Sequence, residues 1–396
     1  MGKPRRLFYF HAMTYTLFDD PAIRASLAPF TLTRPVGAIR VGIMTIAEKW
    51  TAYLTSPVFY DTVDYLSIKY PQSPDANSIR INGAICPTRE LADTVLALKE
   101  NQALFQDNLF IAGNQNPDAQ KISYLKPLSV IRRPWDIFLK NGEQIRNDFD
   151  LIRHNRISEP LHDPRVVVYN PGQVFIEPGA KIKAAILNAE NGPIYIGKDA
   201  EIQEGSMIRG PFALCEGAIV NMGGKMRGDT TIGPFSKVGG EISNSVIFGY
   251  SNKGHDGFIG NTVIGEWCNL GADTNTSNMK NNYSTVRLYN MATGEYEDTG
   301  LQFCGLMMGD HSKTSINTML NTGTVVGVCG NIFGHGFPPK YIPSYSWGGA
   351  QGLEVFRLEK ACEVAEKAMA RRGQAFTKAD KAILTHIFEE FVNKSQ

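Results

Sequence analysis

One of the seven histidines in this chain has neighbours that suit acid–base chemistry. His255 stands in the stretch SNKGHDG, between Gly254 and the pair Asp256 and Gly257. Glycine lets a backbone approach a ligand closely, and imidazole accepts a proton near neutral pH. Asp256 or another nearby carboxylate can orient such a ring. We therefore predict that His255 is a general base, with a surface loop histidine of no chemical role as the alternative.

A second group of residues has the types that handle phosphate. Arg34, Arg40 and Lys49 are set between apolar residues in LAPFTLTRPVGAIRVGIMTIAEKW, residues 27–50. Arginine binds phosphate as a planar fork and lysine as a point charge. Backbone N–H groups of a glycine-rich loop usually complete such a site, but residues 17–26 contain no glycine. The three side chains are therefore candidate phosphate binders without the usual loop.

The segment that must hold His255 carries a sixfold repeat. Its longest run has an aliphatic residue at every sixth position, at Ile196, Ile202, Ile208, Leu214, Val220, Met226, Ile232 and Val238. Shorter runs occur at Ile176 and Ile182, at Phe258, Ile264 and Leu270, and at Met308, Thr314, Leu320, Val326 and Ile332. A period of six suits neither a helix nor simple strand alternation, but it suits a triangular coil of three short strands. We predict a parallel β-helix in which these residues point inward.

Two interruptions of the repeat mark segments that leave the coil. Twenty residues separate Val238 from Phe258, two more than three hexads, and the excess falls near residues 249–257. A longer interruption covers residues 277–300. Long loops in a compact domain usually carry function, and His255 lies in the first of these two.

The parts on either side of the repeat differ from it. Residues 1–160 have no sixfold period. Residues 5–10 and 78–85 have strand patterns and 90–100 a helix pattern, which indicates an α/β domain with a largely parallel sheet. The β-helix is expected over residues 165–345.

The tail, residues 350–396, is expected to form two amphipathic helices. The first covers 352–373 and ends at Gly373, and the second opens at Thr377, with Asp380 three residues on. We expect them to pack on the end of the β-helix or on a neighbouring chain.

Length, charge and cysteine spacing exclude several classes of protein. A chain of 396 residues with net charge +1 is long enough for two or more domains and lacks the basic excess of a nucleic-acid-binding surface. No apolar run reaches the roughly 18–20 residues of a membrane span, and no cleavage site follows the basic start, so we expect a cytoplasmic protein. The six cysteines have no CxxC spacing and are expected to be reduced, buried and structural.

The repeat resembles the left-handed parallel β-helix of the hexapeptide acyltransferases, whose members are typically trimers. Residues 251–288 resemble the acetyltransferase half of the bifunctional N-acetylglucosamine-1-phosphate uridyltransferase/glucosamine-1-phosphate acetyltransferase family. That family carries Lys-x-x-His-x-x-Tyr-Ile-Gly, then Asn-Ile-Gly-Ala-Gly-Thr, then Cys-Asn-Tyr-Asp-Gly. Here His255 falls on the general base, Asn269 begins the second motif and Asn278 matches the loop asparagine. Phe258 and Met279 replace tyrosines of the family.

The resemblance implies acetyl transfer from acetyl-CoA to the amine of an amino sugar phosphate, with His255 taking the proton of the attacking amine. The residues implied to contact the sugar are Lys253, Asp256, Asn269 and Asn278. Family members bind coenzyme A along later coils, between neighbouring chains. His311 and Lys313 in MGDHSKTSINTM are the candidates for that role, with a solvated corner as the alternative.

The histidines also allow a metal-dependent alternative. Some left-handed β-helix trimers hold zinc with three histidines and act as carbonic anhydrases, and His255, His311 and His335 are available here. That family places two of its ligands a few residues apart, and these three histidines include no such pair. His335, in FGHGFP, has the setting of a structural residue.

The first domain resembles the sugar-nucleotide pyrophosphorylases, which makes it a nucleotidyltransferase-like α/β domain. In that family a glycine-rich loop precedes Pro-Leu-Thr and a Pro-Lys pair. Here residues 29–31 and Arg34 with Pro35 fit, but Val36 stands where the lysine should be. Residues 79–87 resemble the strand that ends in a metal-binding Gly-Asp, with Ala84 in place of the aspartate. Residues 131–145 resemble a late Pro-Trp-Asp segment, without the metal ligand that precedes it.

These losses leave three alternatives for the first domain. In the first, the domain transfers a nucleotidyl group, with Arg34, Arg40 and Lys49 as phosphate binders and Mg²⁺ on an aspartate. In the second, it binds a sugar phosphate or nucleotide sugar without activating it. In the third, the basic residues are only solvated. The aspartates available for Mg²⁺ are Asp19, Asp20 and Asp136.

For the whole chain we expect a homotrimeric transferase: an acyltransferase with a degenerate or weak nucleotidyltransferase domain. The competing class is a non-catalytic trimer that senses or channels sugar nucleotides.

Overall fold

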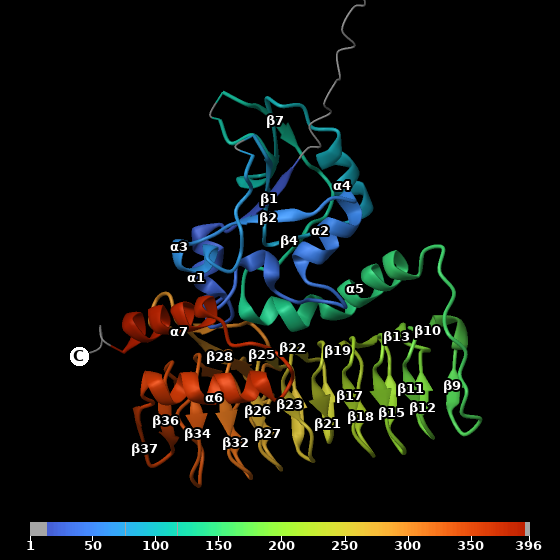
Figure 1. Cartoon of the computed structure of the whole chain (residues 1–396), viewed down its shortest axis with the longest axis vertical. Helices are drawn as coiled ribbons and strands as arrows, with labels where there is room; N and C mark the ends of the chain where they lie inside the picture. Colours follow the sequence, from blue (N-terminus) through green and yellow to red (C-terminus); the bar gives the residue numbers. More distant parts are fainter. Residues whose placement is uncertain (1–13, 76, 117, 393–396) are drawn as a thin grey trace, which may run out of the picture.

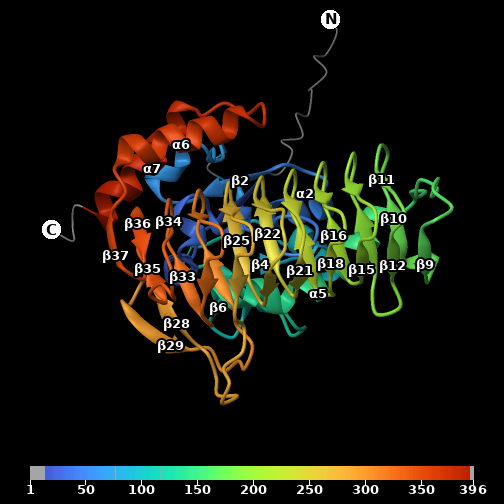
Figure 2. The same cartoon turned by 90° about the horizontal axis from the view of Figure 1, so that it is seen from below.

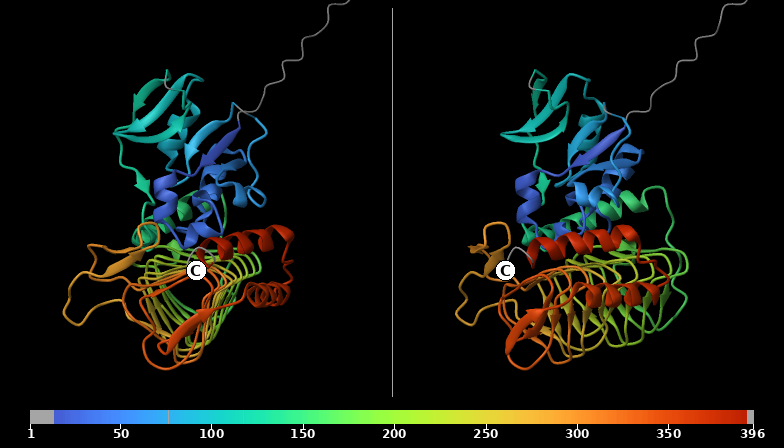
Figure 3. Two further views of the ribbon diagram at one scale, coloured as in Figure 1. Left: turned by 90° about the vertical axis from the view of Figure 1, so that its left-hand side faces the viewer. Right: turned by 60° about the vertical axis from the view of Figure 1, so that its left-hand side comes forward.

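The computed structural model describes residues 14–75, 77–116 and 118–392, and it has three parts (Figure 1). An α/β domain sits on one face of a long parallel β-helix, and two C-terminal helices lie beside the β-helix. Seen along its axis, the β-helix has a triangular outline (Figure 3). The predicted architecture, an α/β domain followed by a left-handed parallel β-helix and a helical tail, is confirmed.

The sheet of the first domain is largely parallel, as predicted, and five of its six strands run in the same direction. Strands β1, β2 and β3 are parallel, but β6 runs antiparallel to both β3 and β5. The reason is local: Asp107, with φ 50°, and Asn108 alone join β5 to β6, and so short a connection makes a hairpin. The sheet order is β2 (Val58–Asp61), β1 (Tyr15–Phe18), β3 (Ile79–Asn82), β6 (Leu109–Gly113), β5 (Gln102–Gln106) and β7 (Gln120–Ser123).

Two of the three elements predicted in this domain are confirmed. Residues 78–85 form β3 and the start of β4 (Ile85–Cys86), which pairs with β8 (Ser129–Val130). The helix expected at 90–100 is α4 (Arg89–Leu96). The strand expected at 5–10 lies outside the described residues. The remaining helices are α1 (Pro21–Ser26), α2 (Ile46–Leu54), α3 (Asp64–Ser67) and α5 (Pro134–Arg153), with short 3-10 turns at Phe30–Leu32 and Val36–Ala38.

Three sheets form the sides of the β-helix, and we name them the first, second and third face. The first face is β10 (Val174–Ile176), β13 (Ile194–Ile196), β16 (Phe212–Leu214), β19 (Thr230–Ile232), β22 (Val246–Gly249), β25 (Val263–Glu266), β30 (Leu306–Met308), β33 (Thr324–Val326) and β35 (Tyr341–Ile342). The second face is β11 (Lys181–Ile182), β14 (Glu201–Ile202), β17 (Ile219–Val220), β20 (Lys237–Val238), β23 (Asn252–Lys253), β26 (Asn269–Leu270), β31 (Lys313–Thr314), β34 (Asn331–Ile332), β36 (Ser346–Gly349) and β37 (Gly352–Val355).

The third face is β9 (Val167–Tyr169), β12 (Ile186–Asn188), β15 (Met207–Arg209), β18 (Lys225–Met226), β21 (Glu241–Ser243) and β24 (Phe258–Gly260), continued by the pair β27 (Asn275–Thr276) and β32 (Met319–Leu320). The sixfold residues from Ile196 to Val238 are all buried in the core that the three faces share. The predicted inward direction of this run is confirmed.

The register after Val238 differs from the prediction. Val238 pairs with Lys253, fifteen residues on, and Ile242 pairs with Ile259, seventeen residues on. These coils are therefore shorter than eighteen residues, and residues 249–257 hold no extra loop. The shift turns Ile259 inward and leaves the predicted core residue Phe258 only partly buried on the outside.

The interruption at 277–300 is confirmed, but it has structure of its own. It contains the antiparallel hairpin β28 (Arg287–Asn290) and β29 (Glu295–Asp298). Leu288 belongs to the core of the first domain, the ring of Tyr289 stacks on Tyr341 at 3.7 Å, and Arg133 bonds Glu297 at 2.9 Å. The hairpin is thus held against the first domain and the β-helix (Figure 2).

The tail helices are α6 (Leu358–Ala370) and α7 (Lys378–Phe391). The predicted capping box of Thr377 and Asp380 is confirmed, whereas residues 352–355 form β37 instead of helix. Cys362 of α6 and Ile387 of α7 share a core with Tyr345 of the β-helix and Leu66 of the first domain. The tail therefore lies along the side of the β-helix, not on its end.

The six cysteines are buried and unpaired, as predicted. In the described part of the chain, no helix has the length and apolar character needed to cross a membrane.

Candidate functional site

His255 lies at a corner of the β-helix, between β23 of the second face and β24 of the third. Its side chain is exposed, as is that of Asp256. Among the described residues, the His255 imidazole has no hydrogen-bond partner, so no carboxylate orients it within the chain. An exposed imidazole at an edge can meet a small molecule or a second chain. The role of His255 as a general base stays a prediction.

Lys253 does not occupy the place expected of a substrate ligand. It takes an inward position of the repeat, opposite Val238, and its side chain is 0% exposed. Its Nζ donates to the carbonyl oxygens of His255 and Asp256, both at 2.6 Å. The prediction that Lys253 contacts the sugar is therefore corrected: the lysine is sealed in the core beneath the His255 corner.

The two asparagines of the predicted site lie on different edges. Asn269 points outward from the second face, next to Asn252, with 3.5 Å between Nδ2 of Asn252 and Oδ1 of Asn269. Asn278 follows β27 at the edge between the third and first faces, and its Nδ2 donates to Asn261 at 2.8 Å. Within one chain, the width of the third face separates Asn278 from His255.

His311 and Lys313 lie at the corner between the first and second faces, under the tail. His311 lines a cavity of about 30 Å³ together with Tyr70 of the first domain and Asp380 of α7. Burial lowers the pKa of His311 to about 3, and its Nδ1 has no partner among the described residues. Nζ of Lys313 donates to the carbonyl of His311 at 2.8 Å. Their predicted contact with coenzyme A stays a prediction.

The three histidines of the metal-dependent alternative do not meet. His255 stands at the corner between the second and third faces, His311 at the corner between the first and second, and His335 is exposed in the loop between β34 and β35. No group of three His, Cys, Asp or Glu residues in the described ranges is arranged to hold a metal ion.

Arg34 joins the first domain to the β-helix. Its guanidinium meets both carboxylate oxygens of Asp310, at 3.1 and 2.5 Å, and Glu266 at 3.3 Å. Thr33 donates to the same carboxylate at 2.8 Å. Burial opposes ionisation of Asp310, but Arg34 holds the pKa of this carboxyl below its usual range.

Arg40 and Lys49 also have partners inside the chain. Arg40 donates to the carbonyl oxygens of Ile43 and Phe248. Lys49, 1% exposed, pairs with Asp148 of α5. Neither side chain is solvated, which excludes the alternative that these basic residues are only solvated. A phosphate would have to displace the partners that they have within the chain. Phosphate binding by the three basic residues stays a prediction, while the contacts support a role in holding α2, α5 and the β-helix together.

Helix α1 stands where the glycine-rich loop of a nucleotide site would follow the first strand. Asp20 caps α1 by accepting from the N–H groups of Ala22 and Ile23. Asp19 accepts from Val36 and Thr62 and pairs with Arg24. Asp136 caps α5. Each aspartate considered for Mg²⁺ therefore has a structural task, and no described contact brings two of them together.

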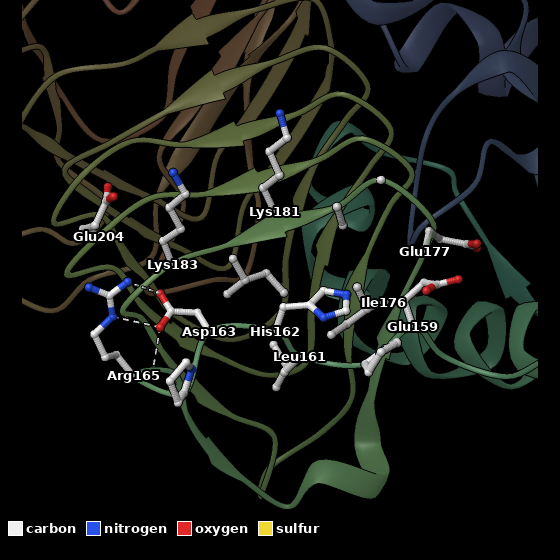
Figure 4. A pocket seen from close by; sticks show the side chains of 15 residues that line it. Glu159, Leu161, His162, Asp163, Arg165, Ile176, Glu177, Lys181, Lys183 and Glu204 are labelled. Atoms are coloured by element: carbon white, nitrogen blue, oxygen red, sulfur yellow. Dashed lines mark hydrogen bonds and ion pairs between the residues drawn. The ribbon is translucent and has the colours of Figure 1, made fainter.

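A cavity of about 670 Å³ lies at the other end of the β-helix, between the linker at 159–165 and the first coils (Figure 4). Its charged lining residues are of both signs and include His162, Lys181, Lys183 and Glu204. Asp163 is already occupied by Arg165 and the N–H of Ala184. None of these residues belongs to the predicted site, and we assign the cavity no role.

Two features near the His255 corner were not predicted from the sequence, the contact of Arg372 and the inward position of Lys253. Arg372, in the turn between the tail helices, donates to Asn252 at 2.8 Å, so the tail reaches the strand that leads to His255. The inward position of Lys253 has a weak signal in the sequence, since Ile242, Ile247, Lys253 and Ile259 follow spacings of five and six residues.

Comparisons with known proteins find similarity to sugar nucleotidyltransferases and to bifunctional nucleotidyltransferase/acetyltransferases. Residues 15–157 match the family model described as Sugar nucleotidyl transferase. A bifunctional sugar-1-phosphate nucleotidylyltransferase/acetyltransferase of Sulfurisphaera tokodaii is 29% identical over 169 residues, 42% of this chain and 40% of that protein. The bifunctional protein GlmU of Bartonella quintana is 26% identical over 192 residues, 44% of this chain and 39% of that protein.

A solved structure, UDP-N-acetylglucosamine acyltransferase from Campylobacter jejuni, matches 58% of this chain and 96% of its own length, at 12% identity and a TM-score of 0.18. The family and sequence matches confirm the predicted resemblance to the bifunctional nucleotidyltransferase/acetyltransferases. The chain spans about 40% of the length of these curated relatives.

Proposed function

We propose that this chain is a transferase of sugar-nucleotide metabolism whose β-helix moves an acyl group from acyl-CoA to the amine of an amino sugar phosphate. The observation that carries the proposal is the exposed His255 on an open edge of the β-helix, within a segment that resembles the acetyltransferase motif. In the reaction the amine nitrogen attacks the thioester carbon, His255 takes a proton from that nitrogen, and the C–S bond breaks to release the coenzyme A thiolate.

The first domain is proposed to bind a sugar phosphate or nucleotide sugar with little or no nucleotidyl transfer. Phosphoryl chemistry of this kind depends on positioned cations and a phosphate-wrapping loop. Here α1 replaces the loop, and Arg34, Arg40 and Lys49 are engaged within the chain. Mg²⁺-dependent release of pyrophosphate from UTP or dTTP with several sugar 1-phosphates, at an ordinary turnover of ~1–10³ s⁻¹, would contradict this part of the proposal.

The active form is proposed to be a homotrimer built on the third face. The first domain covers the first face and the tail covers the later coils of the second, but the third face has neither cover (Figure 3). Val167, Ile186 and Met207 are register partners on it and expose apolar side chains. With the third faces turned to a threefold axis, the His255 edge of one copy meets the Asn278 edge of the next.

The test is acetyl transfer from acetyl-CoA to glucosamine 1-phosphate and related amino sugar phosphates. His255→Ala should lower turnover by roughly 10²–10⁴-fold while acetyl-CoA binding is kept, because a general base acts in the transition state. The matched control is His335→Ala, which removes another exposed histidine, from the loop between β34 and β35, and should retain full activity.

Full activity in His255→Ala would remove the residue-level reason for the proposal. Binding of acetyl-CoA and nucleotide sugars without turnover would support the non-catalytic alternative. Sedimentation that shows a monomer at all concentrations would contradict the trimer.

A further inference from the structure

A lysine in the interior of the β-helix calls for an explanation. Lys253 lies in a register whose members on the two adjacent coils are aliphatic: Val238 is its partner on the preceding coil, and Leu270 follows Asn269, the partner of Asn252, on the next. Burial lowers the pKa of Lys253 to about 8. An uncharged residue would fill this core without the cost of burying an ammonium group.

The corner that carries His255 is wrapped around this ammonium group. Nζ lies 2.6 Å from the carbonyl oxygens of both His255 and Asp256. Gly257 closes the corner with φ 126°, and a Cβ there would lie 3.1 Å from Nζ and 2.4 Å from the Thr274 carbonyl. The carbonyl groups of two successive peptides therefore face the interior of the β-helix.

The geometry of the peptide bond then determines which backbone group at this corner points toward solvent. In a trans peptide the C=O and N–H groups point in opposite directions. The inward carbonyl of His255 belongs to the peptide whose N–H is that of Asp256, so this N–H points away from the core. Among the described residues it has no acceptor, and the side chains on either side of it, His255 and Asp256, are exposed. A free N–H donor thus stands next to the His255 imidazole.

We propose that Lys253 is a positioning residue: it turns the His255 carbonyl inward and thereby presents the Asp256 N–H beside the His255 imidazole as a donor to the acyl oxygen. This inference rests on the proposed acyl transfer. When the amine attacks, the electron pair of the C=O bond moves to that oxygen, and the N–H stabilises the negative charge. When the C=O bond re-forms, the electron pair of the C–S bond leaves with sulfur.

The variant that tests the proposal is Lys253→Met, which keeps the length of the side chain and suits the apolar core. The turnover number should fall roughly 10²–10³-fold, the loss measured when an oxyanion donor is removed. The KM for acetyl-CoA should change far less, and the melting temperature should not fall. The control is Lys237→Met, the same change one coil earlier on the outside of the second face, where Lys237 pairs with Asn252; it should retain activity within twofold.

A crystal structure of Lys253→Met gives a readout that does not depend on turnover. The His255 carbonyl should leave its inward direction, and the Asp256 N–H should turn with it. An unchanged corner would overturn the proposal, and so would unchanged activity or a loss of activity that follows a drop in melting temperature. If the wild-type chain transfers no acyl group to any acceptor, the proposed function fails, and the crystal structure still decides whether Lys253 positions the corner.

Discussion

Replacing Arg34 with methionine distinguishes a residue that joins two domains from one that binds phosphate. The Arg34 side chain is 3% exposed and its guanidinium meets Asp310 and Glu266. Methionine can fill the apolar part of the space beside Phe30 and Phe248. It leaves Asp310 buried without its cation.

The size of the loss follows from the contacts that remain. Breaking a buried ion pair by removing one partner costs about 3–5 kcal/mol, because the other charge stays buried and unpaired. Asp310 would keep two donors, the Thr33 hydroxyl at 2.8 Å and the Glu266 N–H at 2.9 Å. We therefore expect Arg34→Met to lower the free energy of unfolding by about 3 kcal/mol, the lower end of that range.

The assay is a double-mutant cycle with Asp310→Asn, followed by urea unfolding. Because a chain of several parts can unfold in more than one step, the first transition is the one to compare. The double variant should lose less than the two single variants together, with a coupling of about 1–3 kcal/mol. The control is Arg153→Met on α5, whose ion pair with Asp150 is exposed and should contribute less than about 1 kcal/mol.

The same ion pair predicts a pH dependence. A carboxyl whose pKa is lowered on folding stabilises the fold above the unfolded value of about 3.9, and that contribution disappears as the pH falls further. The difference in stability between the wild type and Asp310→Asn should therefore shrink below about pH 4. Additive effects in the cycle, or an Arg34→Met variant as stable as the wild type that no longer binds nucleotide sugars, would refute the structural role and favour phosphate binding.

Three other side chains give measurable outcomes. Burial lowers the pKa of Lys253 to about 8, although the nearby charges of Asp256 and Asp273 act in the opposite direction. Turnover should therefore decline as the pH rises through about 8. The pH profile of Lys253→Met should lack this decline. Burial raises the pKa of Cys268 to about 12, so a thiol reagent should leave this cysteine unmodified in the native protein and label it after denaturation. Tyr345→Phe removes a buried hydrogen bond to the Leu384 carbonyl and should destabilise the packing of the tail by about 1 kcal/mol in thermal unfolding.

The sixfold repeat predicted most of the β-helix because the inner corner of a narrow triangular coil accepts little except aliphatic side chains. That held from Ile196 to Val238, at Ile264 and Leu270, and from Met308 onward. It did not hold in the coil that contains Lys253 and Phe258, because two corners are shorter and Lys253 takes an inward place. A search for aliphatic residues at a fixed period passes over such a coil and assigns Phe258 to the core in place of Ile259.

The contacts of the basic residues could not be read from the sequence at all. Arg34 and Asp310 are 276 positions apart, and neither stands in a sequence motif that predicts their contact. Charged residues between apolar ones have the same pattern whether they bind phosphate or a buried carboxylate. The His255 corner was easier to find because glycine, histidine and aspartate stand together within four residues, and only its local spacing was needed.

The chain itself covers much of its β-helix, and this limits where chemistry can take place. The first face lies under the first domain, with Val246 and Val263 in the shared core, and His311 is enclosed where that domain meets the tail. The third face and its two edges have no such cover. His255 and Asn278 stand on opposite edges of that face, on neighbouring coils, so a site that needs both residues has to be completed by a second copy of the chain. Acyl transfer by a monomer would mean that Asn278 takes no part in it.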